Sequence, residues 1–331
     1  MREYELIRRL AGSFNRSADQ SNTLFECDSE IIQFGDQTWA LTMDDFSPEE
    51  DFFTSDDPER LGNNLAVATL SDLFAAGARP RYYMQTVGLP SDVEQSFVDD
   101  FMQGIRLALD SAGCFLCGGD VGNADPWRYC GFAMGFVEGG PPLKHLIPSA
   151  PQSLWITGEL GDANLAALQR APAPLFELRS KEASFIRTCA TSCIDTSGGL
   201  FDALWLLHEQ NPTATFEIQM AAVPYAAEIK AAASAMAFPP EAALIGGAGE
   251  YELLFTVPER VPGTITNELE RIGATRIGTV FPDAKSSVTF LTGASSTACL
   301  TGPPPCPRDV GDIDRYVKEV MTMAGQLLGG S

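Results

Sequence analysis

The stretch Leu65–Pro80, LAVATLSDLFAAGARP, decides the fold that we expect for the first half of the chain. Apolar residues recur at helical spacing between Leu61 and Phe74, and a glycine, Gly77, follows where the periodic pattern stops. Glycine is the residue that most often ends a helix, because it adopts the left-handed backbone conformation without a steric penalty. We therefore predict a helix over 61–77 that carries Asp72.

Outward from this helix, short apolar strands alternate with amphipathic helices along the rest of the chain. The composition shifts near Pro148–Pro151, which indicates a linker. With 331 residues, the chain has room for two domains of ordinary size. We therefore predict an α/β (α+β) fold with two domains, residues 1–148 and 149–331. The expected helices are 4–14, 92–112, 162–169, 199–209, 226–237 and 265–272, and the expected strands are 38–43, 114–117, 129–137, 154–157, 193–195, 216–220 and 252–257.

The composition excludes several classes of protein. An apolar fraction of 45% is typical of a globular protein with a core. A net charge of −22 disfavours nucleic acid and anionic membranes as partners, because both would be repelled. The charge suits a protein that recruits divalent cations, although an ordinary acidic surface explains it equally well. No long apolar run and no signal-like N-terminus occur, so we expect a soluble, cytoplasmic protein without a membrane partner.

The eight cysteines do not favour a zinc site or disulfides. Cys114 and Cys117 have the spacing of zinc ligands, but they fall in what we interpret as a buried strand, where thiols behave as small apolar groups. The chain contains two histidines, and a structural zinc site needs four suitably spaced ligands. We expect the thiols to be free.

Three aspartates follow predicted strands: Asp44, Asp120 after two glycines, and Asp195. Side chains at strand ends converge where α/β folds usually bind ligands, and Mg²⁺ prefers such hard oxygen ligands. Several carboxylates in one place would repel one another unless a cation lay between them. For any one of them, capping of a turn is an equally good interpretation.

A resemblance to a known family favours the metal site. The stretch Leu65–Pro80 resembles the A-V-N-L-S-D-L-A-A-M-G-A-x-P signature of the thiamine-monophosphate kinases, which belong to the aminoimidazole ribonucleotide synthetase-like superfamily. Further motifs follow in the family's order, so that the resemblance spans about residues 2–316 and marks a divergent member. They are Thr42–Asp44 (the family's S-T-D), Gly118–Asp120 (G-G-D), Ile156–Asp162 (V-T-G…G-D), Ile194–Ser197 (I-D-L-S) and Tyr251–Thr256 (Y-E-L-L-F-T).

The resemblance implies roles for individual residues. Metal-site positions of the family match Asp28, Thr42, Asp44, Asp72, Asp120 and Asp195. Positions that bind ATP match Gly119, Asp120, His145 and Ser197, and positions that bind the substrate match Asp51, Gly249 and Glu250. No side chain is expected to act as a catalytic base, because phosphoryl transfer depends mainly on positioning and charge neutralisation.

The chain also departs from the family's pattern. Cys27 replaces the first aspartate of G-D-D-x-A, and Gly198 replaces the second acidic ligand of S-D-G-L. His145 stands where a basic residue of the nucleotide loop is expected, and Asp51 stands where a histidine is expected. The late tryptophan that stacks on the thiamine ring has no counterpart near 311–316.

The function that this resemblance implies is transfer of a phosphoryl group from Mg²⁺–ATP to thiamine monophosphate, by a homodimer. Two alternatives stay open. The same fold and metal site would serve another small phosphorylated or oxyanion substrate, or the chain is a non-catalytic nucleotide-binding relative. Gly246–Gly249 lacks the lysine of a phosphate-binding P-loop, and neither histidine stands in a Ser-His-Asp context, so a hydrolase is disfavoured.

Overall fold

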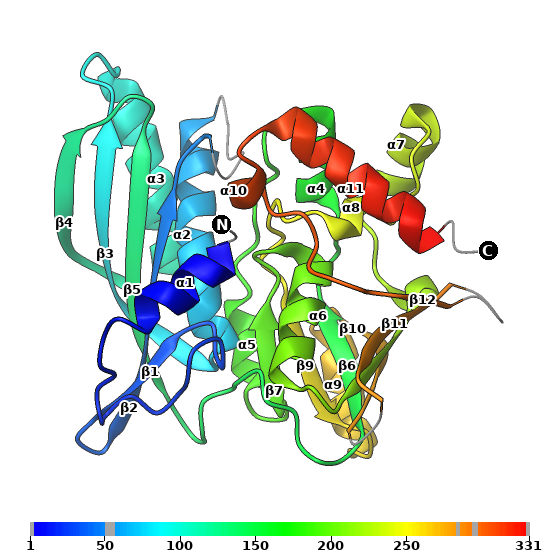
Figure 1. Cartoon of the computed structure of the whole chain (residues 1–331). Coiled ribbons are helices and arrows are strands. Elements are labelled where there is room, and N and C mark those ends of the chain that lie inside the picture. The colour runs from blue at the N-terminus through cyan, green and yellow to red at the C-terminus, as the bar shows by residue number, and fades with distance from the viewer. Residues whose placement is uncertain (1–2, 50–56, 283–284, 293–296, 329–331) are drawn as a thin grey trace.

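The computed structural model describes residues 3–49, 57–282, 285–292 and 297–328, which form two β-sheets that lie side by side with helices between and around them (Figure 1). The elements alternate much as the sequence predicts, and the mixed α/β class is confirmed. None of the described helices is long and apolar enough to cross a membrane.

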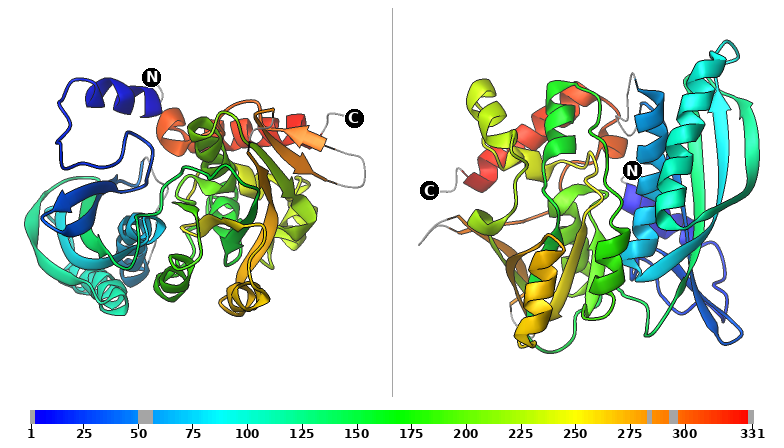
Figure 2. Two further views of the ribbon diagram at one scale, coloured as in Figure 1. Left: turned by 90° about the horizontal axis from the view of Figure 1, so that it is seen from below. Right: turned by 180° about the vertical axis from the view of Figure 1, so that it is seen from behind.

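The first sheet has five strands in the order β1-β2-β5-β3-β4, and it is antiparallel except for the parallel pair β3 and β4. Two helices of 18 residues, α2 and α3, cover one of its faces (Figure 2). The opposite face carries no helix in either view. The bounds are β1 (Glu30–Phe34), β2 (Gln37–Phe46), α2 (Pro58–Ala75), β3 (Ala78–Leu89), α3 (Gln95–Ala112), β4 (Phe115–Asn123) and β5 (Arg128–Val137).

Helix α2 begins where the side chain of Asp57 accepts a hydrogen bond from the backbone N–H of Arg60, and a proline follows this cap. Most of its residues are buried, because it packs between the first sheet, α3 and the strand β7 of the second sheet. Contact with α3 is very close. A Cβ on Gly104 would overlap the carbonyl oxygen of Glu59, so glycine lets the two helix backbones approach.

The second sheet has seven strands in the order β12-β11-β8-β10-β6-β9-β7. All residues of its central strand β6 are buried. Only β8 and β11 pair in parallel; the other pairs are antiparallel. Its strands are β6 (Gln152–Thr157), β7 (Ser192–Asp195), β8 (Thr215–Gln219), β9 (Leu253–Pro258), β10 (Ala274–Phe281), β11 (Ser287–Leu291) and β12 (Thr297–Cys299). The helices of this half are α4 (Asp162–Gln169), α5 (Ser180–Ile186), α6 (Gly199–Gln210), α7 (Ile229–Met236), α8 (Ala242–Ile245), α9 (Gly263–Arg271), α10 (Pro307–Val310) and α11 (Ile313–Leu328), with a 3₁₀ turn at Met220–Ala222.

The N-terminal helix α1 (Glu3–Ala11) lies beside α10, so that the first and last parts of the described chain meet (Figure 1). The Arg308 guanidinium forms an ion pair with Glu3 at 3.1 Å and donates to the backbone carbonyl of Asp45 at 2.6 Å. The Glu3 backbone N–H donates to Asp309 at 2.7 Å. These contacts tie α1, β2 and α10 together.

Two local predictions are wrong. The strand β4 runs on through the two glycines and Asp120, and all of its residues are exposed because it forms the edge of the sheet. Cys114, just before it, is buried, but Cys117 is exposed. Asp44 likewise lies inside β2 rather than after a strand. All eight cysteines are free, as expected.

Candidate functional site

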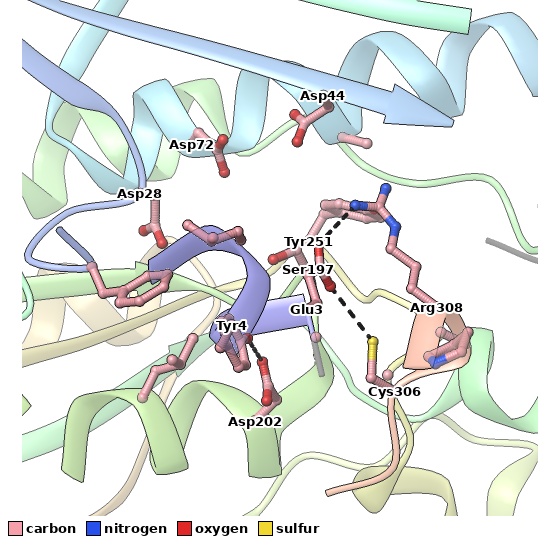
Figure 3. Close-up of a pocket in the computed structure, with 18 of the residues that line it drawn as sticks. Glu3, Tyr4, Asp28, Asp44, Asp72, Ser197, Asp202, Tyr251, Cys306 and Arg308 are labelled. Carbon is pink, nitrogen blue, oxygen red and sulfur yellow. Dashed lines mark hydrogen bonds and ion pairs between the residues drawn. The ribbon is translucent and has the colours of Figure 1, made fainter. Parts of the chain in front are cut away.

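A pocket of about 300 Å³ lies between the two sheets. Segments far apart in the sequence line it, namely α1, β2, α2, α6 and the residues just before it, and the loop residues Phe25, Cys27, Asp28, His145, Gly247, Ala248, Tyr251 and Pro305 to Arg308. Figure 3 shows Asp28, Asp44 and Asp72 on one side of this pocket and Asp202 on α6 on the other.

Asp28, Asp72 and Asp195 form a group of three carboxylates, each with an oxygen within 4.8 Å of the others, and Asp28 and Asp72 line the pocket. The segment before β1 carries Asp28, α2 carries Asp72, and Asp195 is the last residue of β7. The backbone N–H of Asp195 donates to Asp28 Oδ2 at 3.2 Å, which fixes two of the three relative to each other. We call these residues the aspartate cluster.

Burial and nearby negative charge disfavour the charged forms of Asp72 and Asp195. Burial, and then the charges of Asp44, Asp195 and Asp28, raise the pKa of Asp72 well above its ordinary value. Burial and the charge of Asp28 raise the pKa of Asp195 to about 6. Within the described residues, no lysine or arginine forms an ion pair with any of the three carboxylates.

Two neighbours orient the cluster. The Thr42 hydroxyl donates to Asp72. The buried ring of His145 places Nδ1 at 2.7 Å from the carbonyl oxygen of Phe25 and Nε2 at 3.2 Å from Asp28 Oδ1. Both partners are acceptors, so the imidazolium form, which donates from both nitrogens, fits the site. Burial lowers the pKa of His145, but the charge of Asp28 and the hydrogen bonds to Asp28 and Phe25 outweigh it and raise the pKa.

The cluster fits a magnesium ion. Its donors are carboxylate oxygens, which Mg²⁺ prefers, and the 4.8 Å separation allows one ion to reach all three. Oδ2 of Asp195 is buried and has no hydrogen-bond partner among the described residues. A buried carboxylate oxygen without a donor is costly, and a bound cation relieves that cost.

The other predicted site residues fall into three groups. Asp44, His145 and Ser197 line the same pocket as the cluster. Gly119 and Asp120 lie on the edge strand β4, where Asp120 shares a row with Thr86, Cys130 and Asp45 on successive strands. Three strand spacings put it roughly 14 Å from Asp45, and it does not line the pocket. Asp51 lies outside the described residues.

Gly249 and Glu250 do not line the pocket either. The Glu250 carboxylate accepts from the backbone N–H of Asn164 at 3.4 Å and therefore faces the N-terminal end of α4. Burial raises its pKa to about 8, although backbone N–H groups of residues 161–164 act in the opposite direction. The nearby Glu252 is also engaged within the protein, because it pairs with Arg179 and accepts from Thr157 Oγ1 at 2.5 Å.

Among the pocket residues that the sequence analysis missed are Glu3, Tyr4, Asp202, Tyr251 and Arg308. The Tyr4 hydroxyl donates to Asp202 at 2.8 Å. Burial, and then the charges of Glu3, Asp195 and Asp309, raise the pKa of Asp202 to about 7. Of these residues, the sequence pointed to Asp202 alone. It follows Gly198 by four residues at the start of a predicted helix, and residues four apart are neighbours on a helix surface.

Comparison with known proteins defines the class. Residues 27–137 match the family model for the N-terminal domain of AIR synthase related proteins, and this segment contains β2 to β5, α2, α3 and two members of the aspartate cluster. The match covers about a third of the chain and marks a likeness of the first sheet and its two helices to this domain.

Within that class the chain is similar to thiamine-monophosphate kinases, as the motifs predicted. It is 26% identical to the thiamine-monophosphate kinase of Pyrococcus horikoshii over 293 residues, which cover 84% of this chain and 89% of the relative. The Escherichia coli K12 enzyme is 28% identical over 260 residues, or 72% of this chain and 76% of the relative. The structure of AaThiL complexed with AMPPCP and TMP shares the fold, with a TM-score of 0.74, 22% identity and coverage of 90% of this chain and 98% of the other.

Proposed function

We propose that the protein is an ATP- and Mg²⁺-dependent kinase that transfers the γ-phosphoryl group of ATP to the phosphate of thiamine monophosphate. The observation that carries this proposal is the aspartate cluster, whose three carboxylates converge without an arginine or lysine partner in the described part of the chain. Similarity to thiamine-monophosphate kinases over most of the chain supports the choice of acceptor. We also propose a cytoplasmic location and a division into domains at residues 148 and 149.

The aspartate cluster would hold Mg²⁺, and Asp44 faces the same space. When bound, Mg²⁺ neutralises the charge of the phosphates between which the group is transferred. The Thr42 hydroxyl fixes the orientation of Asp72, and His145 fixes that of Asp28. Their task is to hold carboxylate oxygens in place before the substrate arrives, which removes reorganisation from the reaction.

On the acceptor side, the pocket offers aromatic rings together with carboxylates. The rings of Tyr4, Phe25 and Tyr251 line it, and Glu3 adds a carboxylate. A positively charged aromatic ring such as a thiazolium is stabilised by both kinds of contact. These residues differ from the positions that the sequence resemblance implied, and we infer that the recognition of the acceptor has moved to them.

A different acceptor is the second candidate. Glu250, the expected substrate carboxylate, is turned toward α4, and Gly249 is also absent from the pocket wall. An acceptor other than thiamine monophosphate, with a phosphate or another oxyanion to receive the group, suits this altered wall equally well.

A screen of acceptors separates the two candidates. Release of ADP and formation of the diphosphate are measured with thiamine monophosphate and with a panel of other phosphorylated metabolites. Turnover with thiamine monophosphate that exceeds the rest of the panel supports the first candidate. Turnover with another compound alone selects the second. If no compound gives ADP and calorimetry detects no Mg²⁺–ATP binding at millimolar ATP, both are wrong.

We further propose that the protein is a homodimer that pairs through the open face of the first sheet. This face exposes large apolar side chains, with Met43 66%, Met84 45% and Phe115 56% exposed. A helix-free sheet face of this composition marks an interaction surface. Asp120 lies on the same sheet, so its predicted role in nucleotide binding would be served at or near that interface. The substitution Met84→Glu is expected to shift the mass measured by light scattering from dimer to monomer.

A further inference from the structure

A second cavity, of about 430 Å³, lies between the first sheet and α5. The end of α2, the start of β3, the end of α3, and α5 with the residue that follows it form its walls. It shares no lining residue with the pocket beside the aspartate cluster. A cavity of this volume has room for a small molecule.

The charge of this cavity is opposite to that of the whole chain. The chain has 22 lysines and arginines against 44 aspartates and glutamates, whereas three arginines and one carboxylate line the cavity. The arginines are Arg79 and Arg81 on β3 and Arg187 after α5. The carboxylate is Asp110, which already forms an ion pair at 2.8 Å with Arg106, a residue outside the cavity wall. The cavity is therefore a local concentration of positive charge on an acidic protein.

The protein compensates this charge only in part. Glu138, outside the cavity wall, lies 3.1 Å from the Arg79 guanidinium and 3.8 Å from that of Arg187, so one carboxylate serves two arginines. Arg81 forms no ion pair within the described part of the chain. Its guanidinium lies instead over the ring of Phe115, with the central carbon 5.0 Å from the ring centroid.

An arginine held in this way is ready to receive an anion. A guanidinium stacked on an aromatic ring keeps its N–H groups in the plane of the group, where they can donate to an acceptor. The planar fork of these donors matches the oxygens of a phosphate group, and such charge-assisted hydrogen bonds are among the strong ones. Three serines also line the cavity, Ser111, Ser180 and Ser184.

We propose that this cavity binds a phosphate group, either as inorganic phosphate or as part of a small phosphate ester. Arg81 is the principal donor, and Arg79 and Arg187 add the charge that Glu138 does not compensate. Apolar side chains of the wall, among them Phe74, would contact the organic part of an ester. This site is separate from the proposed kinase chemistry, because it lies in another cavity and needs no metal ion.

A purely structural role of the arginines is the alternative. In that case they would serve only Glu138 and the neighbouring aromatic rings. The two roles predict different results for Glu138→Gln. If the cavity binds phosphate, Glu138 competes with it for Arg79 and Arg187, so the substitution should tighten the binding. If the role is structural, the substitution creates no phosphate binding.

The test is a calorimetric titration of the full chain with inorganic phosphate, in EDTA and without ATP. Under these conditions the carboxylates of the first pocket have no metal ion and repel phosphate. We expect Arg81→Gln to weaken the binding about 10-fold or more, and Glu138→Gln to tighten it about threefold. Arg276→Gln, in the exposed pair with Glu259 on β10, is the matched control and should change the binding less than about twofold.

A second titration with phenyl phosphate distinguishes the two forms of the ligand. Tighter binding than that of inorganic phosphate assigns a phosphate ester, and equal binding assigns free phosphate. Failure of both probes to bind the wild type at about 10 mM overturns the inference. Equal losses in Arg81→Gln and Arg276→Gln, or weaker binding in Glu138→Gln, also overturn it. Thermal unfolding checks that each variant is folded, and Glu138→Gln decides alone if Arg81→Gln is not. Because neither ATP nor metal is present, the result is independent of whether the proposed kinase activity is found.

Discussion

Two groups of largely buried carboxylates, Asp28, Asp72 and Asp195 in one and Glu250 and Glu252 in the other, have different surroundings. Asp28 and Asp72 line the pocket, Asp195 lies beside them, and within the described residues one oxygen of Asp195 has no hydrogen-bond donor. Glu250 and Glu252 face into the second half of the chain, where a helix N-terminus and Arg179 receive them. This difference distinguishes a binding site from a structural contact. In a structural contact the protein itself supplies the hydrogen-bond donors to a buried carboxylate, and in a binding site a ligand must do so. The protein supplies hydrogen-bond donors to the second group, whereas one buried oxygen of the first group has no donor among the described residues.

The largest expected effect breaks the first group. Asp72→Asn should lower turnover by about 10²–10³-fold or more, because it removes a charged ligand with little change in volume. Its stability should not fall, since burial and three neighbouring aspartates already disfavour the charge of Asp72. Steady-state ADP release and urea unfolding check both statements. A variant that retains turnover would remove Asp72 from the metal site.

The opposite result is expected for the second group. Glu252→Gln should destabilise the fold by about 3 kcal/mol, because Arg179 is left buried with less compensation. This loss of stability is at the lower end for a broken buried ion pair, because Glu177 at 2.7 Å and Glu182 at 3.7 Å remain near the Arg179 guanidinium. Glu259→Gln, which breaks the exposed pair with Arg276, is the control and should cost less than about 1 kcal/mol in urea unfolding. Equal effects of the two variants would contradict the comparison.

Ligand addition sharpens the comparison further. Mg²⁺ with AMPPCP at about 100 times the dissociation constant should stabilise the wild type by about 2.7 kcal/mol. The same addition should stabilise Glu259→Gln equally and leave Asp72→Asn almost unchanged. Thermal unfolding with and without the ligand measures this, and equal stabilisation of Asp72→Asn would show that the ligand binds elsewhere.

The last prediction concerns pH. The pKa of Glu250 is about 8 in the fold, raised from an ordinary value of 4.5. Between these values the folded chain keeps a proton that the unfolded chain has lost, so stability falls as the pH rises through this window. Glu250→Gln should therefore gain unfolding temperature relative to the wild type from pH 5 to pH 8, and the gain should level off above pH 8. A gain that is constant across this range would mean that Glu250 is already charged in the fold.

The sequence was sufficient for the convergence of Asp28, Asp72 and Asp195, because ordered motifs carry all three. It was not sufficient for Asp120 or Glu250. Asp120 follows two glycines that looked like a strand end, yet pairing with β3 continues the strand through them. Glu250 lies in a motif that implied substrate contact, yet Tyr251 takes a left-handed backbone with φ of 54° and the preceding carboxylate turns toward α4. The positions of both side chains depend on contacts between residues far apart in the sequence, and the spacing of residues within a motif does not predict such contacts.

The contacts that helices make were also harder to predict from the sequence than the helices themselves. The pattern predicted α6, but the Asp202 carboxylate fills the space of a Cβ on Gly198, and this contact follows from side-chain direction rather than from periodicity. The last helix, α11, was not predicted at all, although its buried Tyr316 donates to Asn164 on α4 at 3.1 Å. The role of α11 in the core depends on its contact with α4, which the sequence pattern of α11 does not reveal.

The ion pair between Glu3 and Arg308 has a consequence for biosynthesis. It joins residues 305 positions apart, so one wall of the pocket closes only after nearly the whole described chain has left the ribosome. Domains generally fold as units during synthesis, and the first sheet with α2 and α3 is able to form early. Until residue 308 emerges, however, α1 lacks its partner and the acidic pocket stays open to solvent. The nascent protein therefore completes the wall of this pocket as one of the last events of its folding.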